Sequence, residues 1–218
     1  GGPLFWSHYS YLGLDPRGLR DQYADYWEDN RNHTLINRQY CIENPKGYKG
    51  YGEDCWGLTS VTISSNVTSI GTGAFSYCTS LTNITIPESV TKIGDGVFSY
   101  CPNLTSIAIP EGVSKIGDYA FLGCLNLTSV TIPEGVTEIG DEAFSYCTSL
   151  TSVTIPESIT EIGNGAFWYC TNLASVTIPE SVTKIGDEAF NNCTNLTSVT
   201  FSENTTELGR FVFKGTPY

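Results

Sequence analysis

The chain is poor in positive charge. Its 218 residues include 11 Lys and Arg against 23 Asp and Glu, and the formal net charge is −12 at pH 7. From Leu58 onward there are 5 basic and 15 acidic residues, so this part carries a charge of about −10. Such a surface repels polyanions, which argues against binding to nucleic acid or to an anionic membrane. It fits either a solubilising surface for an extracellular domain or a surface that attracts a basic patch on a partner.

Long apolar runs are absent as well. A membrane-spanning helix needs roughly 18 or more consecutive apolar residues, and no such run occurs, so we expect no membrane insertion. Residues 1–20 lack the features of a signal peptide, which by itself says little about localisation. Hydrophobic residues still make up 40% of the chain, which is typical of a globular protein with a sizeable core.

The cysteines lack the close pairing of a zinc site, which typically uses Cys-x-x-Cys pairs that converge on one point. They are instead spaced 23 residues apart, with one in each copy of a repeat, and Cys41 alone stands outside the series. This spacing predicts a ladder of buried free thiols that pack between neighbouring copies. The series comprises Cys55, Cys78, Cys101, Cys124, Cys147, Cys170 and Cys193.

Catalytic signatures are equally scarce. There is no Gly-rich phosphate loop and no nucleophile elbow, and both histidines, His8 and His33, lie near the N-terminus. We therefore expect no catalytic residue, no metal site and no cofactor, and a protein that is not an enzyme.

What dominates the chain is a 23-residue repeat that begins at Leu58. Its clearest copy is Leu150 to Asn172, LTSVTIPESITEIGNGAFWYCTN. A period of this length is the signature of a solenoid, propeller or array, and so short a unit favours a solenoid. One copy cannot bury its apolar side alone, whereas stacked copies can. The Phe series of the repeat comprises Phe75, Phe98, Phe121, Phe144, Phe167, Phe190 and Phe213.

Each copy contains the pattern of one short strand. Val153 and Ile155 alternate with Ser152 and Thr154, which predicts a strand with one wet face, and Pro156 ends it. A short helical or 3₁₀ turn is expected to begin at Ala166. We predict an α/β repeat solenoid of about seven 23-residue coils with a parallel β-sheet on one face, its strands about 4.8 Å apart.

The repeat also resembles a known family. From about Cys55 to the C-terminus the pattern is Cys-x-x-Leu-x-x-Val/Ile-x-Ile-Pro-x-x-Val-x-x-Ile-Gly-x-x-Ala-Phe. This pattern resembles the BspA-like (Treponema pallidum type) leucine-rich repeat. The resemblance implies a leucine-rich-repeat solenoid over residues 55–218 that has no catalytic residues. It also implies a secreted or cell-surface protein of bacterial type that takes part in adhesion and binds a protein or glycan.

Residues 1–54 share nothing with the repeat. Asp15-Pro16 can start a helix, and the apolar residues from Leu19 to Glu43 suit a helical period. Between about Leu4 and Thr59, the runs NPKGYKGYG and CWGLT are similar to a segment of the glucoamylase-like family that includes bacterial β-1,2-glucanases. Those enzymes resemble (α/α)₆ barrels, of which only a piece is present. We expect residues 1–54 to serve as a helical N-terminal cap on the first coil.

Two surfaces of the predicted solenoid are candidates for ligand binding. The first is the wet strand face, although Ser and Thr also simply suit exposed strands. The second is a tyrosine column before the Cys series, interrupted at Gly123 and Asn192, which either stabilises the coils by ring stacking or contacts a ligand. The candidates are Thr85, Thr131, Thr154 and Thr177 on the strand face, and Tyr146, Trp168 and Tyr169 as an aromatic hot spot.

Three hypotheses for the function stay open. The first is a non-catalytic extracellular or cell-surface protein that binds protein or glycan through weak multivalent contacts of its repeats. The second is an enzyme-derived β-glucan binder that uses Trp6, Tyr48, Tyr51 and Trp56. The third is a chimeric gene product with a fold but no selected function. The ligand and the oligomeric state do not follow from the sequence.

Overall fold

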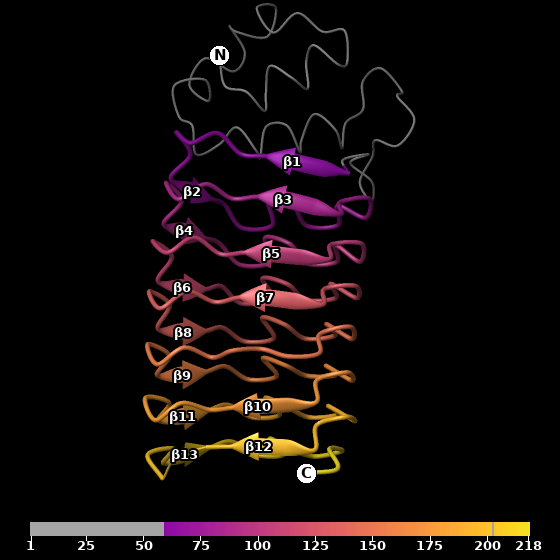
Figure 1. Cartoon of the computed structure of the whole chain (residues 1–218), viewed down its shortest axis with the longest axis vertical. Coiled ribbons are helices and arrows are strands. Elements are labelled where there is room, and N and C mark those ends of the chain that lie inside the picture. The colour runs from indigo at the N-terminus through magenta and orange to yellow at the C-terminus, as the bar shows by residue number, and fades with distance from the viewer. Residues whose placement is uncertain (1–58, 202) are drawn as a thin grey trace, which may run out of the picture.

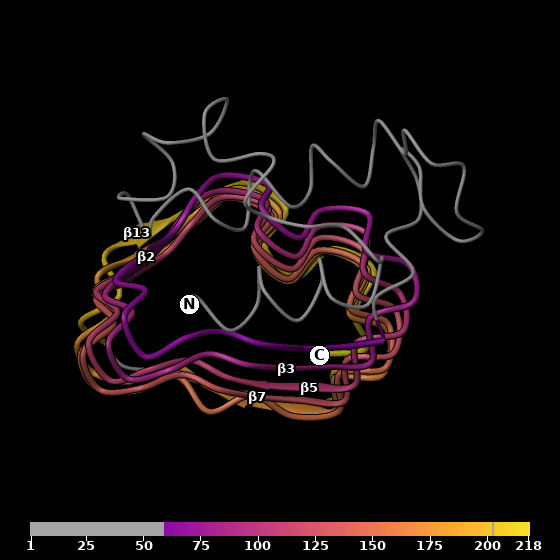
Figure 2. The same ribbon diagram turned by 90° about the horizontal axis from the view of Figure 1, so that it is seen from above.

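The computed structural model describes residues 59–201 and 203–218, and these form a solenoid whose coils stack along one axis (Figure 1). Viewed along that axis, the coils superimpose on a closed outline with one flat side (Figure 2). The described residues contain no helix that could cross a membrane. The expected helical cap over residues 1–54 lies outside the described residues.

The flat side carries the strand that the sequence predicts. Paired strands in this series are parallel and meet at equivalent residues 23 positions apart, as in Val61 opposite Ile84. In the copy that starts at Leu150 the strand is reduced to a bridge between Ser152 and Ser175. The series comprises β1 (Ser60–Thr62), β3 (Asn83–Thr85), β5 (Ser106–Ala108), β7 (Ser129–Thr131), β10 (Ser175–Thr177) and β12 (Ser198–Thr200).

A second series of two-residue strands was not expected, so the prediction of a sheet on one face is incomplete. Five of these strands form one parallel sheet in the order β13-β11-β9-β8-β6. Two residues are too few for an alternating pattern to show in the sequence. The series comprises β2 (Ser69–Ile70), β4 (Lys92–Ile93), β6 (Lys115–Ile116), β8 (Glu138–Ile139), β9 (Glu161–Ile162), β11 (Lys184–Ile185) and β13 (Glu207–Leu208).

The third side of the coil is a run of turns, and the predicted helical or 3₁₀ turn at Ala166 is wrong. The N–H of Trp168 donates to the carbonyl of Gly165 within the turn, at 2.9 Å. The next N–H, that of Tyr169, donates to the carbonyl of Asn191 in the following coil, also at 2.9 Å. Because positive φ recurs at Gly165 and Tyr169, the backbone cannot continue as a helix, and alternate N–H groups point along the solenoid axis.

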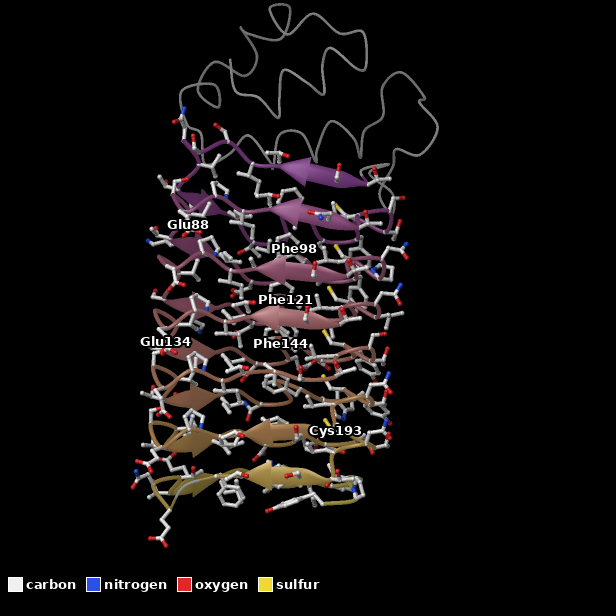
Figure 3. All side chains as sticks on the ribbon, in the orientation of Figure 1. Glu88, Phe98, Phe121, Glu134, Phe144 and Cys193 are labelled. Carbon is white, nitrogen blue, oxygen red and sulfur yellow. The ribbon has the colours of Figure 1, made fainter. Side chains whose placement is uncertain are left out.

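The core is built from columns of identical side chains. Phe98, Phe121 and Phe144 lie directly above one another in the interior (Figure 3), with ring centroids 5.4 and 5.1 Å apart and nearly parallel planes. All three are fully buried, as are Leu127 and Leu150 of the Leu series. Each coil therefore fills the space left by its neighbours, as expected for a quasi-one-dimensional fold.

The predicted thiol ladder is confirmed for the cysteines that the structure describes. Cys78, Cys101, Cys124, Cys147, Cys170 and Cys193 are all free and buried. Each thiol from Cys101 onward lies within hydrogen-bonding distance of a Phe carbonyl in the preceding coil, as at 3.1 Å from Cys193 Sγ to the oxygen of Phe167. Burial raises the pKa of Cys193 to about 12 and that of Cys147 well above its ordinary value. Cys41 and Cys55 lie outside the described residues.

Replacement of Phe144 by Ala should remove one ring from the middle of the buried stack. We expect a loss of about 3–5 kcal/mol in the free energy of unfolding, measured by chemical denaturation. The matched control is Phe213→Ala, because Phe213 belongs to the same column but is only half-buried at the C-terminal end. Equal losses for the two variants would contradict the description of the column as a continuous core.

The buried thiols should resist alkylation in the folded protein. At pH 8, N-ethylmaleimide should leave Cys124, Cys147, Cys170 and Cys193 unmodified, because an alkylation needs the thiolate and burial raises the pKa of each thiol. The same positions should react completely in guanidinium chloride, and peptide mapping by mass spectrometry separates them from Cys41 and Cys55. Rapid labelling of Cys147 in the native protein would show that the ladder opens.

Candidate ligand-binding surface

The strand-face candidates form regular exposed columns. Thr85 pairs with Thr62, Thr131 with Ala108, and Thr177 with Thr200, and the side chains alternate with buried Val and Ile. Thr154 is exposed in the same way. This face is flat and does not contribute to either of the two hollows described below. It offers small hydroxyl groups but no shaped site.

The aromatic candidates, in contrast, lie in direct contact with one another. Tyr146 and Tyr169 are stacked with ring centroids 5.0 Å apart and planes inclined by 5°. Trp168 meets both rings edge-on at 5.2 Å, with interplanar angles of 67° and 71°. The structure therefore brings Tyr146, Trp168 and Tyr169 together as one cluster, which we call the aromatic ridge.

An unusual backbone presents these tyrosines on the turn side. Tyr77, Tyr100, Tyr146 and Tyr169 have φ between 55° and 58°, a region that bulky residues seldom adopt. Each N–H donates along the axis to the following coil, as from Tyr100 to the carbonyl of Leu122 at 2.6 Å. This hydrogen bond holds the backbone in the unfavourable positive-φ conformation. The residues Tyr77 and Tyr100 are 42% and 43% exposed, so this part of the column is available for contact.

The tyrosine column is interrupted by an apolar slot. Tyr77 and Tyr100 are stacked at 4.8 Å, but the next position is Gly123, and the column resumes at Tyr146. A hollow of about 570 Å³ opens there, and the side chain of Leu125 on its rim is 43% exposed. The lining comprises Tyr77, Thr79, Tyr100, Pro102, Gly123, Leu125 and Tyr146.

A second hollow, of about 330 Å³, is acidic. It opens at Gly165, where the neighbouring coils carry Glu142 and Glu188 at the equivalent position, and Trp168 forms part of its wall. Burial, and then the charge of Asp141, raises the pKa of Glu142. The indole Nε1 of Trp168 is buried without an acceptor among the described residues. The full lining is Tyr119, Asp141, Glu142, Asn164, Gly165, Trp168, Asp187 and Glu188.

Some of the acidic side chains that line this hollow also stabilise the fold, because they accept backbone hydrogen bonds from the next coil. The side chain of Asp141 accepts the backbone N–H of Asn164 at 2.7 Å, and Asn164 in turn accepts the N–H of Asp187 at 2.8 Å. At the C-terminal end, Asp187 accepts the N–H of Arg210 at 2.7 Å, and the guanidinium of Arg210 lowers the pKa of Asp187. Within residues 59–201 and 203–218, no group of three or more His, Cys, Asp or Glu is arranged to hold a metal ion.

Sequence reasoning found the ridge but missed both hollows. Gly123 was visible as a break in the tyrosine column, and Tyr119, Glu142 and Glu188 as departures from Gly in the column four positions earlier. An absent side chain makes a hollow only if its neighbours keep their places, which the pattern alone does not establish. Trp6, Tyr48, Tyr51 and Trp56, the alternative glycan site, lie outside the described residues.

The fold and its stacked columns define a leucine-rich-repeat solenoid, and comparison with known proteins gives the family. The family model described as "BspA type Leucine rich repeat region" matches residues 50–174 and 114–218 in six copies, fewer than the about seven coils expected. The chain belongs to this family.

Solved structures of leucine-rich-repeat proteins agree with this assignment. The T. pallidum leucine-rich-repeat protein is 36% identical with a TM-score of 0.68, and the match covers 72% of this chain and 76% of that one. A leucine-rich-repeat protein of Eubacterium ventriosum is 30% identical with a TM-score of 0.68, over 78% of this chain and 45% of the other.

One relative of a different kind fits the N-terminal segment. An exo-β-1,2-glucooligosaccharide sophorohydrolase (non-reducing end) of Parabacteroides distasonis is 59% identical over 66 residues. The match covers 30% of this chain but only 9% of the enzyme's length, and it agrees with the resemblance of the N-terminal runs to the β-1,2-glucanase family. So small a fragment does not establish enzymatic activity.

Proposed function

We propose that this chain is a non-catalytic interaction protein, secreted or exposed on a cell surface, that binds a protein ligand through its turn side. The observation that carries the proposal is the aromatic ridge, in which Tyr146, Trp168 and Tyr169 touch one another between two hollows. Large aromatic side chains contribute most of the energy of many protein interfaces, and a repeat protein of this family suggests such a role.

The ridge is a better candidate than the strand face because it departs from the repeat. The position of Trp168 is occupied by Ser76, Ser99 and Ser145 in other coils. Those serines are buried, and two of them share a hydrogen bond of 2.8 Å between Ser76 Oγ and Ser99 Oγ. A Trp is therefore not required at this position by the coil itself, which supports a role in binding. Thr85, Thr131, Thr154 and Thr177 are proposed as secondary contacts for a protein or glycan.

The organisation of the whole chain is part of the same proposal. Residues 1–54 would form a helical cap and residues 55–218 a solenoid of about seven coils. A cap is needed because an open solenoid end exposes strand edges and core side chains. The proposed binding function requires no cofactor.

Replacement of Trp168 by Ser should separate binding from folding. On arrays of purified extracellular and cell-surface proteins, any ligand of the wild-type chain should bind the variant at least tenfold more weakly, which corresponds to about 1.4 kcal/mol. The melting temperature should stay close to that of wild type, because Ser is the residue that three other coils carry here and Ser145 Oγ, which has no partner in the part of the chain that the structure describes, would gain a neighbour.

The control for this experiment is Thr154→Ala on the strand face, which should keep binding within about twofold because a single exposed hydroxyl contributes little. If Thr154→Ala weakens binding and Trp168→Ser does not, the ligand lies on the strand face and the ridge is not the site.

A second function is supported by the sophorohydrolase match. In this alternative the N-terminal segment, through Trp6, Tyr48, Tyr51 and Trp56, would hold a β-glucan without cleaving it, and the solenoid would serve as a stalk. Hydrolysis would need two carboxylates placed across the scissile bond, and the fragment is 9% of the enzyme's length.

Calorimetric titration with β-1,2-glucooligosaccharides tests the alternative. Binding by the wild-type chain that vanishes in Trp56→Ala and persists in Trp168→Ser would establish the enzyme-derived glycan binder. Under the protein-binding proposal we expect no heat of glucan binding from the wild-type chain or from Trp56→Ala. We also expect Trp56→Ala to bind the same proteins on the array as wild type does.

A further inference from the structure

The slot at Gly123 has the dimensions of one missing ring. Successive rings of the tyrosine column are 4.8 Å apart for Tyr77 and Tyr100 and 5.0 Å apart for Tyr146 and Tyr169. Since one coil is skipped at Gly123, the backbones at Tyr100 and Tyr146 are separated by about twice the strand spacing, or roughly 10 Å. A planar ring that enters between them and displaces the leaning Tyr100 ring toward Tyr77 would face Tyr100 on one side and Tyr146 on the other, within the range of aromatic stacking.

The walls of the slot also fix the chemistry of an occupant. They are the aromatic rings of Tyr100 and Tyr146 and the aliphatic side chains of Pro102 and Leu125, and at the floor the edge of the Tyr100 ring lies against Gly123. No ionisable carboxyl, amine or guanidinium group lines the slot. An aromatic side chain matches this lining better than a charged or strongly polar one.

The surroundings determine the charge of the partner. Tyr146, which lines the slot, touches Trp168, which lines the acidic hollow, so the two hollows lie side by side across the ridge. The carboxylate of Glu142 in the acidic hollow has no hydrogen-bond or ion-pair partner among the described residues. Within residues 59–201 and 203–218, the only cation paired with the acids that line this hollow is Arg210, which binds Asp187. A segment that crosses the ridge from the slot therefore meets uncompensated negative charge.

We propose that the slot at Gly123 receives an aromatic side chain of a protein partner whose neighbouring residues are basic. This inference rests on the proposed protein-binding function and specifies its ligand. Two coils separate Gly123 from Gly165, an axial distance of roughly 10 Å. The two positions are also offset by four residues around the coil, so an extended peptide needs at least three residues to cover the distance. The aromatic residue and the basic residue should therefore be at least three positions apart in the partner.

The probe that tests this is the blocked peptide Arg-Gly-Gly-Trp-Gly-Gly-Arg, titrated into the full chain and followed by two-dimensional NMR. We expect saturable shifts of the Gly123 and Leu125 amide signals. Peptides with Leu in place of Trp, or with Glu in place of both Arg residues, should each bind at least tenfold more weakly. Equal binding of the Leu peptide would overturn the aromatic occupant, and equal binding of the Glu peptide would overturn the basic partner.

Gly123→Tyr is the decisive variant, because it completes the column and fills the slot. Tyr already occupies the equivalent position in four other coils at positive φ. A Cβ at Gly123 would lie 3.0 Å from Cδ1 of the Tyr100 ring, which can rotate to relieve the contact. We expect at least a tenfold loss of peptide affinity. The matched control is Asn192→Tyr, which fills the other break in the same column outside the slot and should bind as wild type does.

Leu125→Thr provides a second test if Gly123→Tyr does not fold. Thr79, Thr148 and Thr171 occupy the equivalent position, so the variant should fold. It removes the apolar side chain on the rim of the slot and should lower the affinity for the peptide several-fold. Unchanged affinity in a folded Gly123→Tyr, or in Leu125→Thr, would overturn the slot. Such a result would leave the proposed function intact, since that function is tested separately by the protein ligand of Trp168→Ser and by the glucan titration.

Discussion

The backbone hydrogen bonds between coils, in a register of 23 residues, are the constraint on which the rest of the structure depends. On the strand sides bonds run in both directions, as from the N–H of Gly94 to the carbonyl of Ile70 in the preceding coil at 2.9 Å and from the N–H of Ile178 to the carbonyl of Thr200 in the following coil at 2.7 Å. On the turn side the N–H of Phe75 donates to the carbonyl of Val97 in the next coil at 2.9 Å. Because the bonds run along the axis on every side, each residue lies against its own equivalent one coil away.

This register places each residue against its equivalent in the next coil, often a residue of the same type, with different consequences for different side chains. For Phe and Tyr it produces stacked rings, and for Cys it produces buried thiols with raised pKa. For carboxylates it places like charges in a row, as at Asp118 and Asp141, which is unfavourable. The row is relieved where Asn164 interrupts it and where Arg210 ends it. Neutral and basic departures in this column thus have a structural reason.

The sequence predicts the features that the register repeats and misses those that depend on short or absent elements. The solenoid, the first strand series and the thiols from Cys78 to Cys193 follow from periodicity, because the same residue type recurs at the same position. The two-residue strands such as β9 (Glu161–Ile162) have no internal pattern to reveal them. The turn run at Ala166 was misread as helical, since Tyr169 at φ 57° gives no sign in the sequence of its left-handed backbone. The hollows at Gly123 and Gly165 require knowledge of what the neighbouring coils hold in place.

A solenoid of this kind can carry a specific site at little cost to its fold. Each coil contacts only its neighbours, so a substitution at a turn-side column position affects one or two interfaces rather than the entire core. Gly123 and Trp168 are such substitutions, and both lie on the turn side within a short length of the axis. The buried Phe column continues past them without a break. The core does not require these departures from the repeat, and they gather on one face. Ligand binding therefore explains them better than a contribution to stability does.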